Sequence, residues 1–473
     1  MEWGPFEPIL ALVVPKSGRN DGIMDRRQKD ATLAHMLGSD ELMTAIRLAS
    51  IAQIDTVLSH EAFHVDQLPW SFLLLVLAKA SKMEHIKYQT EQVLSDRMTL
   101  LCQMTQVFYH VPMSLAMKEM KKLSILCDQY TRLAIDMQQS IKTIFSLQTF
   151  LTRFHQQGHV TLTPLHAHFF YLCLHAKCYF AAMDILDKNL VEIHAQSHVV
   201  TCVDFLGYAY YGGLLYLGEK RYQDALDFFQ LAITAPAVSL SAFVIEAYKK
   251  LLLVTLILHG DAVVVPKYTP FVVTRNVANH CTAYVDLANA FVIEKDFAVV
   301  QDVVAKNEEL FIQDGNFGLV KQVVQAFKQR KLLRLTRTYA TIELTKIAMA
   351  AGMSNSDAVT AEKMLLALIS NGQMDAVIDK QKAMVRFVHK NEDGSACQDE
   401  AQSEASKRLQ DEMKKLVTVA SQLRDMDTEL VTSTKFQSRL QNDKDRRSRI
   451  NMHNQQGDER LITDGASGMD TLE

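Results

Sequence analysis

An internal repeat in the middle of the chain limits the folds that this sequence can adopt. The segment LCLHAKCYFAAMDIL (172–186) aligns with LLYLGEKRYQDALDFF (214–229) at an offset of 43 residues, and leucine, lysine, tyrosine, alanine and aspartate recur at matching places. This offset is the length of a helix pair in an α-solenoid. Because one such pair cannot bury its apolar face alone, the sequence predicts a stacked array of helical hairpins.

The second copy of the repeat resembles a tetratricopeptide repeat, since it carries Gly213, Tyr216, Ala225, Phe229, Ala232 and Pro236. We expect Gly213 and Ala225 to let the two helices approach closely. Tyr216 and Phe229 would fill the groove between neighbouring pairs, and Pro236 would end the second helix. Two unrelated amphipathic hairpins remain the alternative to a true array.

Scarce turn-forming residues favour a mostly α fold with few tight turns. The 473 residues include only 18 glycines and 9 prolines, about half the usual share. After an irregular extension (1–30), apolar residues recur with helical spacing at 42–57, 70–82, 85–108, 112–136 and 138–156. We therefore expect a helical-repeat array over residues 31–330.

A different pattern follows the array. Strand-like alternation in TYATIEL (338–344) precedes two helical segments, and two short alternating runs come next, at 376–379 and 384–389. Strand, helix, helix and hairpin is the order of a winged helix, which we place at 331–390.

The C-terminal part contains a long helix with an apolar seam. A polar linker (391–406) precedes a predicted helix at 407–432, and the polar tail 433–473 is expected to be disordered. Coiled-coil a and d spacing, with one gap at Asp427, defines the seam: Leu409, Met413, Leu416, Ala420, Leu423 and Leu430. We predict that this seam binds a partner, and a coiled-coil homodimer would explain it equally well.

The order of these parts resembles the PCI-domain family, the shared subunits of the proteasome lid, the COP-nine signalosome and a translation initiation factor. The resemblance to signalosome members rests on YYGGLLYLGEKRYQDALDFFQLAITAP (210–236), EAYKKLLLVTLILHG (246–260), VPKYT (265–269), GLVKQ (318–322) and RLTRTYATIEL (334–344). It places a PCI domain at about 222–390, made of the last repeats and the winged helix. A paralogous subunit of the proteasome lid is the alternative.

This resemblance implies a non-catalytic scaffold subunit of the complex that removes a ubiquitin-like modifier from cullin-RING ligases. In that family, winged-helix sheets pair edge to edge and the C-terminal helices form a bundle. The expected partners are therefore other signalosome subunits, with cullin-RING ligases reached through the complex. The expected location is the cytoplasm and nucleus.

One motif favours an enzyme instead. His60–Glu61–Ala62–Phe63–His64 is a literal H-E-x-x-H, which on a helix binds zinc, with Glu61 as general base and Glu84 or His85 as a third ligand. The motif lies where helical spacing stops, just before Pro69, so we interpret it as an inter-helix turn with exposed histidines. A zinc hydrolase is the alternative of another class.

Other signs of catalysis are incomplete. His166–Ala167–His168 is similar to the H-x-H of the signalosome's catalytic subunit, but Ala176 and Tyr179 replace the serine and aspartate that this motif requires. We interpret the pair as helix surface. The sequence contains neither a phosphate-binding G-x-x-x-x-G-K-[ST] nor a G-x-S-x-G. We expect no catalytic residues, no metal and no cofactor.

The charge pattern does not favour nucleic acid. The net charge is −4, and the densest basic cluster comprises Lys328, Arg330, Lys331, Arg334 and Arg337. We interpret it as a solvated face or a contact with an acidic subunit. The tail cations alternate with aspartates, which weakens a nuclear-import signal: Lys444, Arg446, Arg447 and Arg449.

Membrane and secretory classes are not favoured either. The longest apolar runs (72–78 and 251–258) are under half of the roughly 20 residues that span a bilayer, and Glu2 and Glu7 stand where a signal peptide carries lysine or arginine. Seven cysteines without a C-x-x-C spacing fit reduced thiols. We expect no membrane partner.

Overall fold

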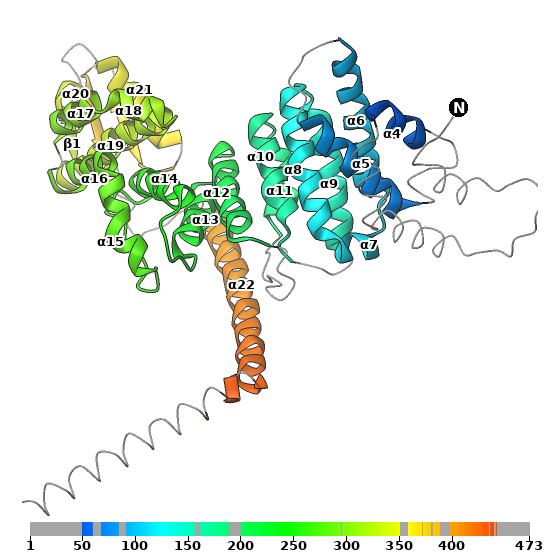
Figure 1. Cartoon of the computed structure of the whole chain (residues 1–473). Helices are drawn as coiled ribbons and strands as arrows, with labels where there is room; N and C mark the ends of the chain where they lie inside the picture. The colour runs from blue at the N-terminus through cyan, green and yellow to red at the C-terminus, as the bar shows by residue number, and fades with distance from the viewer. Residues whose placement is uncertain are drawn as a thin grey trace, which may run out of the picture. The chain divides into compact units, whose positions relative to one another are not determined.

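The structure is a computed structural model that describes residues 50–441, apart from 60–67, 85–90, 157–160, 189–199, 295, 351–357, 371, 380–381, 388–397, 435 and 439–440. Almost every described segment is helical, which confirms the mostly α prediction (Figure 1). The chain divides into two compact units, residues 1–387 and 388–473. The predicted extension at 1–30 lies outside the described residues.

The first unit begins as a succession of packed helices. They are α4 (Ile51–Leu58), α5 (Pro69–Glu84), α6 (Glu91–His110), α7 (Met113–Lys118), α8 (Met120–Asp136), α9 (Ser140–Gln156), α10 (Pro164–His175), α11 (Phe180–Leu186), α12 (Cys202–Gly218), α13 (Tyr222–Thr234), α14 (Ala242–Leu258), α15 (Phe271–His280), α16 (Thr282–Asn289), the π-helical η3 (Ala290–Glu294), α17 (Phe297–Lys306), α18 (Glu308–Gln313) and α19 (Phe317–Thr338). One continuous apolar core runs through them from Ile54 to Phe327.

The 43-residue repeat corresponds to a repeated turn. Lys177, between α10 and α11, and Lys220, between α12 and α13, both have a left-handed backbone, with φ of 56° and 60°. In each turn the next residue donates its N–H to the carbonyl five residues earlier, at 2.9 Å. Gln138, between α8 and α9, repeats this geometry with φ of 54°. These Schellman turns reverse the chain without glycine and confirm the predicted hairpins.

Close contact between α12 and α13 depends on glycine. A Cβ added to Gly213 would lie 2.6 Å from the ring of Phe229, which is fully buried. Ala225 is also fully buried, and α13 ends at Thr234, two residues before Pro236. The predicted packing of the second repeat copy is therefore present in the structure.

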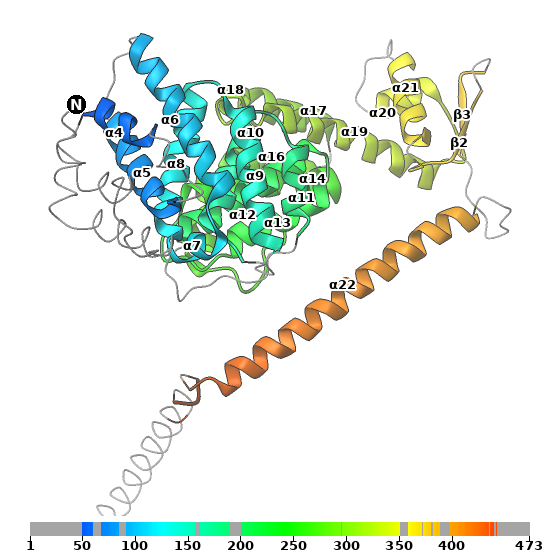
Figure 2. The same ribbon diagram turned by 90° about the vertical axis from the view of Figure 1, so that its right-hand side faces the viewer.

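Helix α19 connects the array to the winged helix (Figure 2). Its first half contributes Val323 and Phe327 to the array core, whereas Leu332 belongs to a second, separate core. The boundary that we placed between residues 330 and 331 thus falls inside a 22-residue helix. A single rigid helix shared by two cores links them more tightly than a loop would.

The winged helix contains β1 (Thr341–Glu343), α20 (Leu344–Ala350), α21 (Ala358–Ser370), β2 (Ala376–Asp379) and β3 (Met384–Phe387). The strands form an antiparallel sheet in the order β1-β3-β2. Val385 of the central strand pairs with Ile342 on one side and Ile378 on the other. Leu365 of α21 and Val385 are fully buried in the second core, so the predicted strand–helix–helix–hairpin order is confirmed.

The second unit is described by α22 (Gln398–Thr432), a helix of 35 residues. It begins inside the segment that we interpreted as a linker (391–406), because polar residues at its start continue the helix instead of interrupting it. No glycine or proline occurs from 398 to 432, so nothing in the sequence ends the helix earlier. Most of the predicted tail, from residue 442 on, lies outside the described residues.

Candidate functional site

The predicted seam on α22 is exposed along its length. Its five large side chains have more than half of their surface accessible: Leu409 (65%), Met413 (58%), Leu416 (68%), Leu423 (59%) and Leu430 (54%). Ala420 is exposed as well. Scattered exposed leucines are ordinary, but a continuous apolar stripe marks an interaction surface.

The exposed apolar face is broader than the a and d spacing predicts. Val417, Val419, Met426 and Val431 are between 48% and 69% exposed. Met426 lies three residues after Leu423 and four before Leu430, so all three side chains share one side of the helix. Met426 therefore fills the gap that the heptad pattern shows at Asp427. A search at 3.6-residue spacing would have found it.

Such a face can pack against other helices. Burying each leucine or methionine from water contributes roughly 1.5–3 kcal/mol before the costs of ordering and association. Charged residues on the same helix pair locally, as Lys415 and Glu412 do at 3.1 Å. The partner-binding role of the six seam residues stays a prediction.

The sheet of the winged helix presents a second candidate surface. Its outer strands, β1 and β2, each have one edge that no other described strand covers. Val377 on β2 is 52% exposed. Unpaired backbone groups on an edge strand can add a strand from another chain.

The zinc site of the enzyme alternative lies almost entirely outside the described residues. His60, Glu61, His64 and His85 lie outside the described residues. Glu84 is described, and its carboxylate accepts a hydrogen bond from Arg132 at 3.1 Å. Among the residues that the structure describes, no three His, Cys, Asp or Glu side chains are grouped as metal ligands.

The surface interpretation of His166 is wrong. His166 is fully buried at the start of α10, where its Nδ1 accepts from the N–H of Thr163 at 3.1 Å. Its Nε2 therefore carries hydrogen and donates to Nε2 of His155 at 3.0 Å. Burial lowers the pKa of His166 to about 3 and of His155 to about 4, so both are neutral. The helix cap turns this imidazole inward, whereas His168 is only partly buried.

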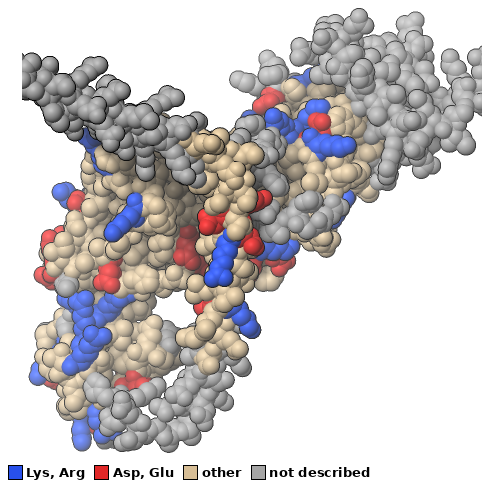
Figure 3. All heavy atoms as spheres, turned by 90° about the horizontal axis from the view of Figure 1, so that it is seen from below, with Lys and Arg blue, Asp and Glu red and all other residues tan. Residues whose placement is uncertain are grey.

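Much of the basic cluster on α19 contacts other groups of the same chain. Arg330 donates to the last carbonyl of α14 at 2.7 Å. Lys328 and Lys331 lie over the rings of Phe297 and Phe327, 4.8 and 5.4 Å from the ring centres. On the face in Figure 3, Lys and Arg side chains lie in several groups, with acidic and uncharged residues between the groups.

The cysteines in the described range are free thiols, and Cys127, Cys173 and Cys281 are buried. Burial raises the pKa of Cys281 to about 11, so this thiol is not activated. The helices that the structure describes include none with the length and apolar character needed to cross a bilayer.

Comparison with known proteins adds two family matches. A family profile described as "COP9 signalosome complex subunit 3, N-terminal helical repeats" matches residues 33–273. The PCI domain profile matches residues 304–389, a narrower range than the 222–390 that we expected. Both matches cover segments that the structure shows as helical array and winged helix.

Two curated relatives carry the same name, COP9 signalosome complex subunit 3. The protein from Dictyostelium discoideum is 31% identical over 320 residues, which cover 67% of this chain and 74% of the relative. The protein from Arabidopsis thaliana is 39% identical over 228 residues, which cover 48% of this chain and 51% of the relative.

Proposed function

The chain belongs to the COP9 signalosome subunit 3 family, and on that premise we propose that the apolar face of α22 holds it in the complex. It is a non-catalytic PCI subunit whose partners are other subunits of the complex. The resemblance to the PCI-domain family is confirmed, and it is the third-subunit family within it. The zinc-hydrolase and proteasome-lid alternatives are therefore set aside.

We propose that the complex removes a ubiquitin-like modifier from cullin-RING ligases. This chain contributes architecture to that reaction and reaches the ligases through the complex. It acts in the cytoplasm and nucleus. Direct nucleic-acid binding is not part of the proposal, because Lys328, Arg330 and Lys331 of the α19 cluster contact the chain's own rings and carbonyls.

A single observation supports α22 as the assembly element. The helix lies in a unit of its own, and its five large seam residues are 54–68% exposed. A face of this kind is stabilised by neighbouring helices. In a family of multi-subunit complexes, those helices come from different subunits.

The winged helix would supply a second contact. Strands β1 and β2 end the sheet on its two sides, and each is only three or four residues long. Short edges limit indiscriminate pairing, yet they suffice for a matched neighbouring sheet. We expect this contact to set which subunits are adjacent, and the α22 bundle to hold them together.

Co-purification of variants with the other subunits tests the proposal. Truncation at about residue 400, or Leu416→Glu with Leu423→Glu, should leave the first unit folded and remove the chain from the complex. The matched control is Thr418→Glu with Ser421→Glu, which adds the same charge on the opposite side of α22. The control should still co-purify.

Two results would contradict the proposal. If both seam variants remain in the complex, α22 is not the assembly element. If the isolated wild-type helix forms a tight homodimer and the whole chain sediments as a dimer, the seam serves self-association.

A further inference from the structure

A groove of about 510 Å³ opens on the array, among helices α8, α10, α12 and α14, and neither proposed contact uses it. The groove is deep where Gly207 of α12, which has no side chain, lies against Ala167 of α10. A Cβ added to Gly207 would be 3.3 Å from the Cβ of Ala167. We call it the acidic–aromatic groove and define it by Asp128, Asp136, Asp204, Tyr171, Tyr211 and Phe243. Its volume is within the ~300–1,000 Å³ of ligand pockets.

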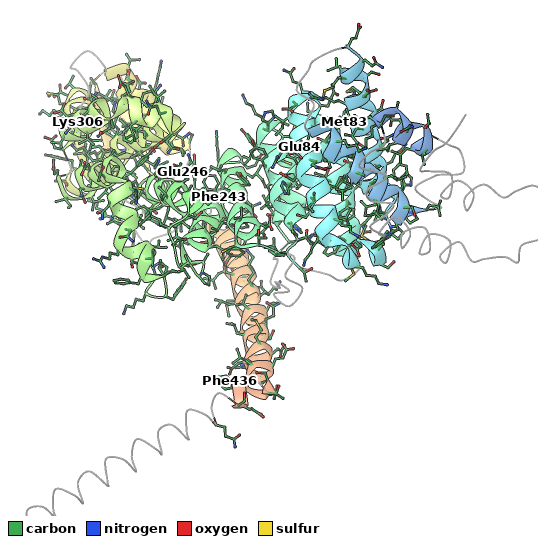
Figure 4. The ribbon with its side chains drawn as sticks, viewed as in Figure 1. Met83, Glu84, Phe243, Glu246, Lys306 and Phe436 are labelled. Carbon is green, nitrogen blue, oxygen red and sulfur yellow. The ribbon has the colours of Figure 1, made fainter. Side chains whose placement is uncertain are left out.

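Three aromatic rings form one wall of this groove. The ring centres of Tyr171 and Tyr211 are 5.4 Å apart, and those of Tyr211 and Phe243 are 5.7 Å apart. Tyr171 is 39% exposed, so its ring is accessible to a ligand. Figure 4 labels Phe243, which lines the groove from α14, and Glu84, which pairs with Arg132 of the lining.

Carboxylates outnumber cations in the lining of the groove. Asp128, Asp136 and Asp204 line it together with one cation, Arg132. Arg132 is already paired with Asp128 at 2.7 Å and with Glu84 at 3.1 Å. His168, the remaining basic group of the lining, has its pKa lowered by burial, so it adds no positive charge near neutral pH.

Two of the carboxylates are available to a ligand. Asp136 is the last residue of α8, where the helix dipole disfavours a negative charge, and it forms no hydrogen bond or ion pair with a side chain that the structure describes. Asp204 is held in place by the N–H and hydroxyl of Thr201, at 2.9 and 2.7 Å. A cation between them would therefore meet one unpaired and one pre-oriented carboxylate.

We propose that the acidic–aromatic groove binds a segment of another protein in which arginine is flanked by apolar residues. A guanidinium can stack on a tyrosine ring and bind a carboxylate through two parallel hydrogen bonds at once. The ammonium of lysine is a compact charge without the planar fork, so it fits this combination less well. Val203, which also lines the groove and is 62% exposed, can pack against the apolar residues on either side of the arginine. Nucleic acid and anionic lipid are repelled by the carboxylates.

Fluorescence anisotropy with the full chain tests the proposal. The probe is a labelled nine-residue peptide of alternating leucine and arginine, and the matched probe has neutral citrulline in place of arginine. We expect the arginine probe to bind at least about tenfold more tightly at 150 mM salt. Asp136→Asn with Asp204→Asn should remove most of that difference, because asparagine preserves the helix cap but not the charge.

The control variant is Asp302→Asn with Glu309→Gln, which removes the same charge from exposed sites outside the groove. It should bind the probe like the wild type. Tyr171→Ala should weaken binding at least about threefold, and Tyr268→Ala, at a ring 75% exposed outside the groove, should not. Helical melting curves check that each variant is folded.

Three outcomes would overturn the inference. Equal affinity for both probes would show that the groove does not select a cation. An equal loss in the groove and control variants would show non-specific charge attraction. At least tenfold tighter binding by a chain ending at residue 434 would show that its own tail, with Arg446 and Arg447, occupies the groove.

Discussion

Helices α13 and α22 carry comparable apolar faces in opposite surroundings. Phe229 of α13 is fully buried between α12 and α14, whereas Leu423 of α22 is 59% exposed. Both helices are amphipathic, and the apolar residues of both recur at three- and four-residue steps. An apolar stripe therefore predicts a buried face but does not predict which chain buries it.

In the array, the apolar face of each helix is buried by other helices of the same chain. Each hairpin covers the face of the previous one, so the core is continuous from Ile54 to Phe327. Helix α22 has no repeat on either side in the sequence, and it forms a separate unit. A substitution on the apolar face of α22 should therefore affect the binding of partners more than the folding stability of the chain.

The largest expected effect is in the array. Phe229→Ala should destabilise the first unit by about 3–5 kcal/mol, because it removes a fully buried ring and leaves a cavity between three helices. Urea unfolding followed by circular dichroism measures this loss. A cost below about 1 kcal/mol would mean that α13 is not a packed part of the array.

Gly213→Ala tests the close packing of α12 against α13 through the sign of its effect on stability. Helix propensity alone predicts that alanine stabilises α12 by about 1 kcal/mol. The added Cβ would lie 2.6 Å from the buried Phe229 ring, so we expect a net cost of about 1–3 kcal/mol instead.

Gly318→Ala is the control for this substitution. It also lies in a helix, but nothing lies within 4 Å of its Cβ position. It should be neutral or stabilising by up to about 1 kcal/mol. If both glycine variants change thermal stability in the same direction, the close helix contact does not decide the effect.

Acid should destabilise the array through its buried histidines. The pKa of His166 is about 3 in the fold and about 6.5 in an unfolded chain, so between these values only the unfolded chain binds the proton. The contribution of His166 to stability is full above pH 6.5 and falls as the pH falls, with a slope of up to about 1.4 kcal/mol per pH unit. His155, whose pKa is lowered to about 4, adds to the loss in the same direction.

Melting temperatures between pH 7 and 5 measure this slope. His166→Asn should flatten it, and α22, which contains no histidine, should not contribute to it. An unchanged slope in the variant would show that other groups cause the acid sensitivity.

The smallest effect is expected on α22. Leu423→Ala should change the stability of the isolated chain by no more than about 0.5 kcal/mol, because the side chain is already exposed. The same variant should weaken retention in the complex, which quantitative co-purification measures. A large loss of stability in the isolated chain would show that the seam packs on its own chain.

Sequence patterns were sufficient where they report local geometry. The two copies of the repeat aligned Lys177 with Lys220, and the structure gives both residues the same left-handed turn. The strands at 376–379 and within 384–389 also followed from alternation. Met426 was missed because heptad spacing is stricter than the periodicity of a single helix.

The remaining features depend on contacts that spacing cannot show. The H-x-H pattern is identical whether His166 faces water or His155, and only the packing of α9 against α10 decides this. The groove gathers carboxylates and rings from four helices between residues 128 and 243.

A helical array, a winged helix and a long amphipathic helix could be predicted from the amino-acid pattern, because helix and strand periodicity are properties of neighbouring residues. Which apolar and charged faces are buried within the chain depends on how distant helices pack. Arg330 donates a hydrogen bond to a carbonyl of α14, more than 70 residues away in the sequence. Because of this contact, its guanidinium is engaged within the fold. Burial is a relation between distant segments, so it is settled only when they pack.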